Sequence, residues 1–274
     1  MMKQRIFWSG LLPLVLMLLL IPAARAEIPY FEDAVAAGTL PPMKERLPEN
    51  PLVSKLAEGQ SIGHYGGDLR SLIGNPSDVK LMFVNGYARL VGYNASLEIV
   101  PDILQSVEVE EGRVFTMKLR EGHKWSDGKP FTSEDFRYWW EDIANNPKLS
   151  PAGPPAALLV HDELPKVEFP DPLTVIYSWS VPNPNFLPAL AGAAPLLIYR
   201  PAHYLKAHHE DHMDMSKMTP KQKIMMKSWA ANHNRLDNLY QFNNPDLHIA
   251  ALAKCNRVPC DPVFRGAERL FSPG

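Results

Sequence analysis

Cysteine is scarce in this chain of 274 residues, which contains only Cys255 and Cys260. Two cysteines do not provide the ligand spacing of a structural zinc site. The sequence also lacks an HExxH pattern, a nucleophile elbow and a glycine-rich phosphate-binding loop. An enzymatic function therefore has no support in the sequence, and we predict a protein that is not an enzyme and uses no cofactor.

The chain lacks a large excess of either charge, because 28 basic and 30 acidic residues give a formal net charge of only −2. A chain of this charge carries no electrostatic signature for binding nucleic acid or an anionic membrane surface. Hydrophobic residues make up 46% of the chain, which argues against disorder and favours one or two folded domains. We therefore predict a folded protein with no nucleic-acid partner.

The N-terminus has the parts of a secretory signal peptide. Lys3 and Arg5 precede an apolar stretch at residues 11–21, and residues 24–26 form a small-x-small cleavage site. The alternative is an uncleaved membrane anchor, but this stretch is shorter than the ~20 residues that a spanning helix needs. We expect residues 1–26 to be a signal peptide cleaved after Ala26. No cysteine follows the apolar stretch to carry a lipid anchor, so we predict a freely diffusing periplasmic protein.

Residues 118–136 place the end of a strand, a turn and the start of a helix in one short segment. Residues 114–119 are rich in β-branched and apolar side chains, which predicts the strand. Asp127-Gly128 supplies a residue able to take positive φ in a tight turn. Thr132 and Asp135 predict a capping box at the start of a helix, whose buried face is Phe136, Trp139, Trp140 and Ile143.

This strand–turn–helix segment resembles that of the family 5 extracellular solute-binding proteins, which deliver peptides, nickel or oligosaccharides to ABC importers. Further pieces resemble the same family in the same order, and the similarity spans roughly residues 65–247. Those pieces are the segment 94–103 before the paired strands, the next strand at 167–177, the proline-rich segment 182–187 and the helix start at 201–205.

The resemblance implies an α/β fold, namely a periplasmic-binding-protein type II-like lobe with a small α/β insertion and with the second lobe missing. Residues 27–80 and 191–247 would form the discontinuous first lobe, beginning with an N-terminal arm at 28–60. Residues 81–190 would form the inserted α/β subdomain.

Inside that subdomain we expect a hairpin at 107–119 with its turn at Glu111-Gly112, and a strand at 173–179. The first lobe would resume with an apolar strand at 195–199, followed by helices. Trp139 and Trp140 could line a sugar or peptide pocket, but aromatic residues at helical spacing are more often core, and we do not assign them to a site.

The best candidate ligand-binding residues are Asn75, Ser77 and Asp78, in a turn-prone loop after a weakly alternating segment at 66–74. Loops at strand ends often bind ligands in α/β sheets, and the matching loop of the resembling family borders its ligand cleft. The alternative is an ordinary strand-end turn, because Asn, Pro, Ser and Asp favour turns in any protein.

Residues 208–215 gather imidazole, carboxylate and thioether groups in a short stretch. His208 and His212 would share a helix face at a spacing of i, i+4, and capture of nickel or copper is conceivable. The alternative is a solvated loop or helix end, and this interpretation is favoured for a short polar run. We therefore assign no metal site and keep His208 and His212 as secondary candidates.

The resemblance stops at Leu247, and the tail at 248–274 has no clear hydrophobic period. We hypothesise that this tail is the same gene read out of frame. Permitted codons for residues 266–274 read in the alternate frame as Glu-Arg-Asn-Asp-Tyr-Phe-His-Arg, whereas the family continues with a segment like Glu-Arg-Asn-Pro-Tyr-Phe. Cys255 and Cys260 would then be incidental rather than a designed disulfide.

From its residues and from the family resemblance together, we predict that the chain is the periplasmic substrate-binding component of an ABC importer. It would be a truncated and impaired monomer that binds a small solute, a peptide above all, and docks on a membrane permease. Two alternatives stay open: a periplasmic nickel- or copper-binding protein that uses the 208–215 cluster, or a fragment without transport activity.

Overall fold

The computed structural model describes residues 31–53, 59, 61, 72, 74, 89–125, 127–192, 195–214, 216, 218–220 and 228–237. The expected signal peptide at 1–26 and the tail at 248–274 lie outside the described residues, as does the loop at 75–78. Among the described residues, none of the helices is both long enough and apolar enough to span a bilayer.

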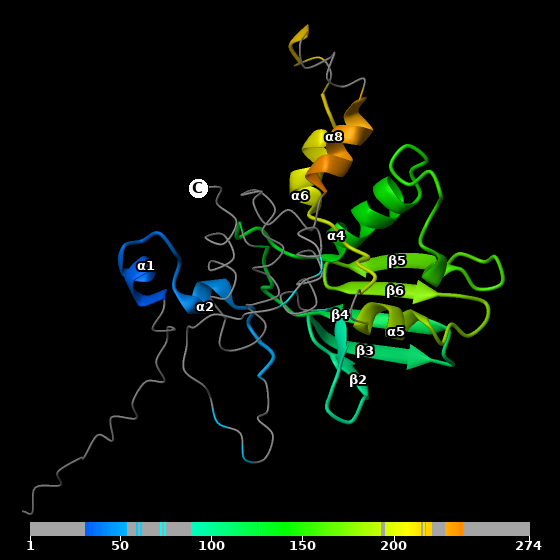
Figure 1. The fold of residues 1–274 in the computed structure, drawn as a ribbon, viewed down its shortest axis with the longest axis horizontal. Coiled ribbons are helices and arrows are strands. Elements are labelled where there is room, and N and C mark those ends of the chain that lie inside the picture. Colours follow the sequence, from blue (N-terminus) through cyan, green and yellow to red (C-terminus); the bar gives the residue numbers. More distant parts are fainter. Residues whose placement is uncertain are drawn as a thin grey trace, which may run out of the picture.

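The centre of the fold is an antiparallel four-stranded sheet in the order β3-β4-β6-β5 (Figure 1). Its strands are β3 (Leu104–Glu110), β4 (Val114–Leu119), β5 (Lys166–Asp171) and β6 (Thr174–Ser178). Along β4 the side chains of Phe115, Met117 and Leu119 are buried, whereas those between them are partly exposed. This period of two gives the sheet one core face, and the strand predicted at 114–119 is confirmed.

The β3-β4 hairpin turns at Glu111 and Gly112, as predicted. Both residues have positive φ, 52° and 67°, and the Arg113 N–H donates to the Glu110 carbonyl at 3.0 Å. Two consecutive residues with positive φ match the right-handed twist of the flanking strands.

The single strand predicted at 167–177 is wrong, because this segment is a hairpin of β5 and β6. Pro172 has no N–H and cannot continue a ladder. Asp171 closes the turn, since its carboxylate accepts hydrogen bonds from the Leu173 N–H at 2.8 Å and from the Thr174 hydroxyl at 2.7 Å. The strand predicted at 173–179 corresponds to β6.

The segment at 94–103 contributes to a separate two-stranded sheet of β1 (Val91–Tyr93) and β2 (Ile99–Pro101). The Asn94 side chain organises the turn between them, because its carbonyl oxygen accepts from the N–H groups of Ser96 and Glu98, both at 2.9 Å. Helix α5 (Phe186–Ala191) contacts both strands.

Helix α4 (Ser133–Tyr138) begins with the predicted capping box. The Thr132 hydroxyl accepts from the Glu134 N–H at 3.3 Å, and the Asp135 carboxylate accepts from the Thr132 N–H at 2.9 Å. The helix continues as a π-helical segment, η3 (Trp139–Ala144). The side chains of Phe136, Trp139 and Ile143 are buried and Trp140 packs at the edge of the core, so the interpretation of both tryptophans as core residues is confirmed.

The strand predicted at 195–199 is wrong, since these described residues belong to no strand. Their backbone is bound by loops and helices instead: the Leu196 N–H donates to the Ala189 carbonyl at 2.8 Å, and the Arg200 N–H donates to the Asp135 carbonyl at 3.1 Å. The predicted helix start at Pro201 is confirmed by α6 (Ala202–Leu205), which runs into the 3₁₀ turn η5 (Lys206–His208). Helix α8 (Trp229–Leu236) contacts η5.

Two aromatic clusters hold these elements on the core face of the sheet. In the first, Phe186 of α5 packs against Phe115 and Tyr177 with ring centroids 5.0 and 5.1 Å apart. The second fills the space between the strand–turn–helix segment and the chain before α6, and its members are Trp125, Phe131, Phe136 and Tyr199. Rings at these separations add to the stability gained from burial alone.

The short helices α1 (Glu32–Ala36) and α2 (Met43–Arg46) belong to the N-terminal arm. The chain after α2 is bound to the turn that follows β4, because the Glu49 N–H donates to the Glu121 carbonyl at 3.0 Å and Arg120 donates to the Asn50 carbonyl at 2.9 Å. The described part of the arm therefore packs at the end of the sheet from which the strand–turn–helix segment leaves.

Candidate functional site

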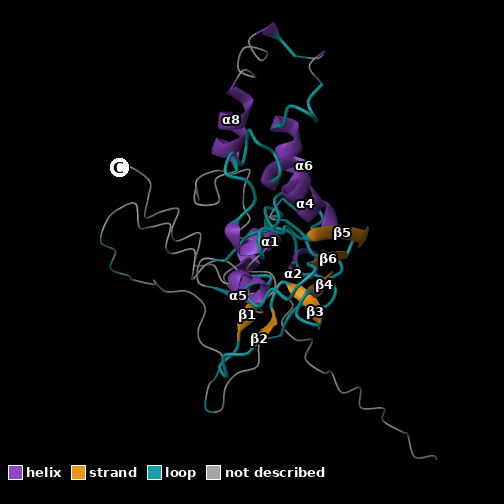
Figure 2. Ribbon diagram, turned by 90° about the vertical axis from the view of Figure 1, so that its right-hand side faces the viewer, coloured by secondary structure: helices purple, strands orange, loops and turns teal. Residues whose placement is uncertain are grey.

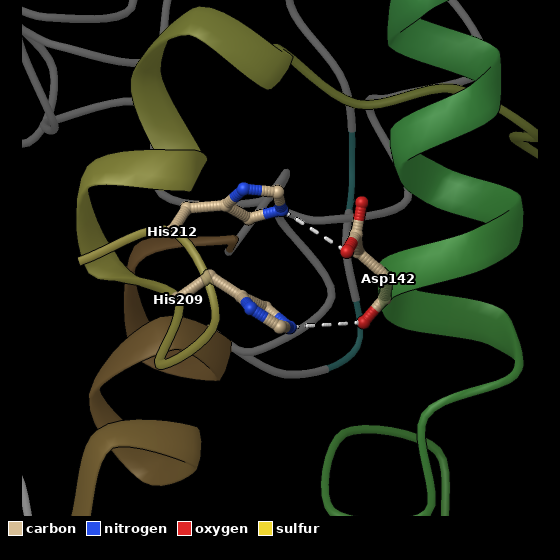
Figure 3. A group of neighbouring side chains, drawn as sticks. All are labelled: Asp142, His209 and His212. Atoms are coloured by element: carbon tan, nitrogen blue, oxygen red, sulfur yellow. Dashed lines mark hydrogen bonds and ion pairs between the residues drawn. The ribbon is translucent and has the colours of Figure 1, made fainter.

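A cluster of ionisable and aromatic side chains lies where the chain after α6 packs on η3. Figure 3 shows His209 and His212, which follow η5, turned toward Asp142 of η3. His212 Nε2 lies 3.0 Å from Asp142 Oδ1, and His209 Nε2 lies 3.2 Å from the Asp142 main-chain oxygen. One potential ligand atom from each residue lies within 4.8 Å of the others, so these residues form a group that could hold a metal ion.

The environment of this cluster differs between its two histidines. The His209 side chain is fully buried and its ring packs edge-on against Trp229, with centroids 4.7 Å apart. The His212 side chain is 31% exposed and Asp142 is 16% exposed. The cluster therefore has one buried side chain that could bind a metal ion, and two such side chains that solvent can reach.

The second ring nitrogen of His209 faces Asp211. Its Nδ1 accepts a hydrogen bond from the Asp211 N–H at 3.3 Å, and it lies 3.8 Å from the Asp211 carboxylate. A ring protonated on Nε2 and not on Nδ1 satisfies both the Asp211 N–H and the Asp142 carbonyl, and Nε2 also lies 3.3 Å from the Asn146 side-chain nitrogen.

A third histidine, His233 of α8, lies next to His209, with the two ring centroids 5.9 Å apart. Its Nε2 is 2.7 Å from the Tyr138 hydroxyl oxygen, and its buried Nδ1 has no hydrogen-bond partner. Burial is the main cause that lowers the pKa of His233 to about 4, and the nearby His209, His208 and Arg200 lower it further. His233 is therefore neutral at neutral pH and belongs to the packing of α8 on α4.

Of the two secondary metal candidates, His208 and His212, only His212 lies in the cluster. Helix η5 ends at His208, so His208 and His212 share no helix face, and the proposed i, i+4 pairing is wrong. The His208 ring instead packs against Tyr204, with centroids 5.6 Å apart. The structure groups His212 with His209 and Asp142, two residues that sequence reasoning missed.

The other predicted site residues, Asn75, Ser77 and Asp78, lie outside the described residues. Their assignment to a ligand cleft therefore stays a prediction.

The strand–turn–helix segment has a structural centre in Asp135. Its buried carboxylate accepts from the Trp125 indole N–H at 3.2 Å and from the Ala202 N–H at 3.0 Å. Burial outweighs these hydrogen bonds and raises the pKa of Asp135 to about 6. This side chain therefore joins the start of α4 to the start of α6.

Residues 98–228 match the family model described as bacterial extracellular solute-binding proteins, family 5 middle. Over 140 residues the chain is 36% identical to the periplasmic alpha-galactoside-binding protein of Rhizobium meliloti, a match that covers 44% of this chain and 20% of that protein. It is also 39% identical over 62 residues to the periplasmic murein peptide-binding protein MppA of Escherichia coli, which covers 23% of this chain and 12% of that protein.

Two solved structures share the fold. The oligopeptide-binding protein OppA superposes with a TM-score of 0.62 at 32% identity, covering 76% of this chain and 32% of that one. The binding protein MelB of Agrobacterium fabrum, solved with stachyose, gives 0.54 at 30% identity, covering 70% of this chain and 31% of that one. The chain spans about a third or less of these proteins, and the predicted α/β, type II-like fold class is confirmed.

Proposed function

Because the chain belongs, over residues 98–228, to the family 5 extracellular solute-binding proteins, we propose that it is the N-terminal part of a substrate-binding component of an ABC importer. The observation that carries this proposal is the continuous order of β3, β4, α4, β5 and β6 within a fold that superposes on OppA. The chain would bind a small solute without transforming it and present it to a membrane permease.

We place this activity in the periplasm, with residues 1–26 removed as a signal peptide. The relatives that support this location carry the word periplasmic in their names. Solute capture there needs no oligomer, and we propose that the chain acts as a monomer.

A peptide is the first solute class that we propose. OppA and MppA are named for binding oligopeptides and murein peptides, and the OppA superposition covers the larger share of this chain. An α-galactoside oligosaccharide is the second class, favoured by the 140-residue match to an alpha-galactoside-binding protein and by the similarity to MelB with stachyose.

Calorimetric titration of the purified chain distinguishes the two classes. A tripeptide and tetrapeptide mixture and stachyose are added separately, and we expect heat and a raised melting temperature from the peptides only. Stachyose binding in place of peptide binding would assign the chain to the second class. Binding of neither solute would contradict the proposal and support the alternative of a fragment without transport activity.

The role of the 75–78 loop is tested with the double variant Asn75→Ala, Asp78→Ala. We expect it to weaken solute binding at least about tenfold, because buried polar contacts to a ligand contribute of the order of 1.5 kcal/mol or more. Glu108→Ala, on the exposed side of β3, is the matched control and should bind as the natural chain does. Equal affinity in the double variant would assign the loop to an ordinary turn.

A further inference from the structure

We infer that Asp142, His209 and His212 form a binding site for a divalent transition-metal ion of the zinc, nickel and copper group. This inference rests on side chains of η3 and of the segment after η5, and it does not depend on which solute the chain binds. It uses none of the residues 75–78, to which we assign solute binding.

The donor chemistry selects the class of ion. Two imidazole nitrogens and one carboxylate oxygen are suited to borderline cations such as Zn²⁺, Ni²⁺ and Cu²⁺, whereas Ca²⁺ and Mg²⁺ prefer oxygen ligands alone. The Asp142 main-chain oxygen, 3.2 Å from His209 Nε2, is a fourth atom within reach of an ion between the three side chains. Solvent reaches the partly exposed His212, which provides an entry path and a water ligand.

The spacing of the donors fits this role after a small adjustment. Metal–nitrogen bonds of about 2.0–2.1 Å place neighbouring ligand atoms about 3–3.5 Å apart in a tetrahedral site. The His212 Nε2 and Asp142 Oδ1 atoms already lie 3.0 Å apart, whereas the full group spans up to 4.8 Å. Ion binding therefore requires these side chains to move closer together, and the partly exposed Asp142 has more freedom to move than the fully buried His209.

The second shell contains a partner for the buried ligand. When His209 Nε2 binds an ion, the ring proton must move to Nδ1, which then gives up the hydrogen bond that it accepts from the Asp211 N–H at 3.3 Å. The Asp211 carboxylate, 3.8 Å from Nδ1, lies just beyond hydrogen-bond distance, and a shift of this exposed side chain would let it accept the new N–H and raise the basicity of the ring as a ligand. The π-helical form of η3 is a further sign, because single-turn π segments occur frequently at functional sites.

Without metal, the same side chains make a hydrogen-bonded contact that holds the 209–213 segment on η3. A merely structural contact and a metal site therefore predict different responses to added ion. Only the metal site predicts tight, saturable binding that depends on the His212 ring nitrogen and on the charge of Asp142.

The chain offers a matched control in the pair of His203 and Asp127. His203 Nε2 lies 2.7 Å from Asp127 Oδ2, so this pair has the same chemistry as His212 and Asp142. Within the part of the chain that the structure describes, no third donor joins it, because only the cluster of Asp142 groups three candidate ligands.

The experiment is a Zn²⁺ titration of the full, chelator-treated chain at pH 7.5, followed by calorimetry and by the thermal unfolding midpoint. We expect one saturable site and a midpoint that rises with Zn²⁺ concentration. His212→Gln and Asp142→Asn should each weaken Zn²⁺ binding at least about tenfold, since even the loss of a residue that only hydrogen-bonds to a metal ligand costs about 10–100-fold. His203→Gln should leave the affinity unchanged.

Asp142→Asn keeps the fold testable, because the amide oxygen can still accept from His212 while the negative charge is lost. Three results would overturn the inference: no Zn²⁺ binding by the natural chain, unchanged binding in both cluster variants, or an equal loss in His203→Gln. Unchanged binding would place the ion on other donors of the chain. Loss confined to the two cluster variants, with unchanged far-ultraviolet circular dichroism, supports the site.

Discussion

At the level of single residues, two buried histidines determine how the fold responds to acid. Burial lowers the pKa of His123 and of His233 to about 4 from an ordinary value of 6.5, with a further contribution from Arg120 to His123. These two histidines therefore bind more protons in the unfolded chain than in the folded chain between about pH 6.5 and pH 4. The stability that they contribute is complete above this window and is lost as the pH falls through it. Asp135, whose pKa burial raises to about 6, acts in the opposite direction below about pH 6 and offsets part of this loss.

We expect the urea midpoint to fall markedly between pH 7 and pH 5, with each histidine able to contribute on the order of 3 kcal/mol over the whole window. His123→Phe should reduce this pH dependence, because neither ring nitrogen of His123 has a hydrogen-bond partner and Phe131 already packs beside it. The control is His161→Asn, at an exposed residue whose φ of 48° asparagine tolerates. An unchanged pH dependence in His123→Phe would contradict this assignment.

Single residues also show how far sequence reasoning reaches. The capping roles of Thr132 and Asp135 were predictable, because both partners lie within one helical turn. The contact between Asp142 and His209 was not, since 67 residues separate them and only the packing of the segment after η5 on η3 brings them together. His209 and His212 alone, at i, i+3, gave no reason to prefer them over His208.

At the level of elements, the start of α4 depends on one hydroxyl. Thr132→Ala removes the acceptor for the Glu134 N–H and should lower the free energy of unfolding by about 1 kcal/mol, within the range of about 0.5–2 kcal/mol for lost N-caps. Thr132→Ser keeps the hydroxyl and should recover most of the loss. Urea unfolding of the three proteins measures this, and a serine variant as unstable as the alanine variant would show that the hydroxyl is not responsible.

The two elements that were mispredicted have different physical causes. The hairpin of β5 and β6 was read as one strand, because Asp171, Pro172 and Leu173 form a turn only when the Asp171 carboxylate accepts from the residues after it. Residues 195–199 have the composition of a strand but no ladder partner among the described residues. The Leu196 N–H donates to the Ala189 carbonyl instead, and the next residue, Arg200, donates to the Asp135 carbonyl. The Asp171 turn is local, and its Asp-Pro pair was a turn signal in the sequence. The missing ladder partner of residues 195–199 could not be foreseen from local composition.

At the level of the whole molecule, the chain contains only part of what its relatives contain. It covers 32% of OppA and 20% of the Rhizobium relative. In two-lobed receptors, closure of one lobe on the other buries the ligand. Under the hypothesis that the chain lacks the second lobe, we expect its affinity for a solute to be weaker than that of a two-lobed receptor, since less buried area offsets the cost of association.

The proposed shift of reading frame near Leu247 decides whether a second lobe is encoded beside this chain. We expect the nucleotide sequence from about codon 240 onward to continue in the alternate frame, through a segment like Glu-Arg-Asn-Asp-Tyr-Phe, into several hundred bases of open frame. Sequencing that region of the gene tests this directly. A stop codon early in the alternate frame, or codons for residues 266–274 that do not encode this segment, would make the tail a genuine part of the protein and would give Cys255 and Cys260 a structural role to be sought.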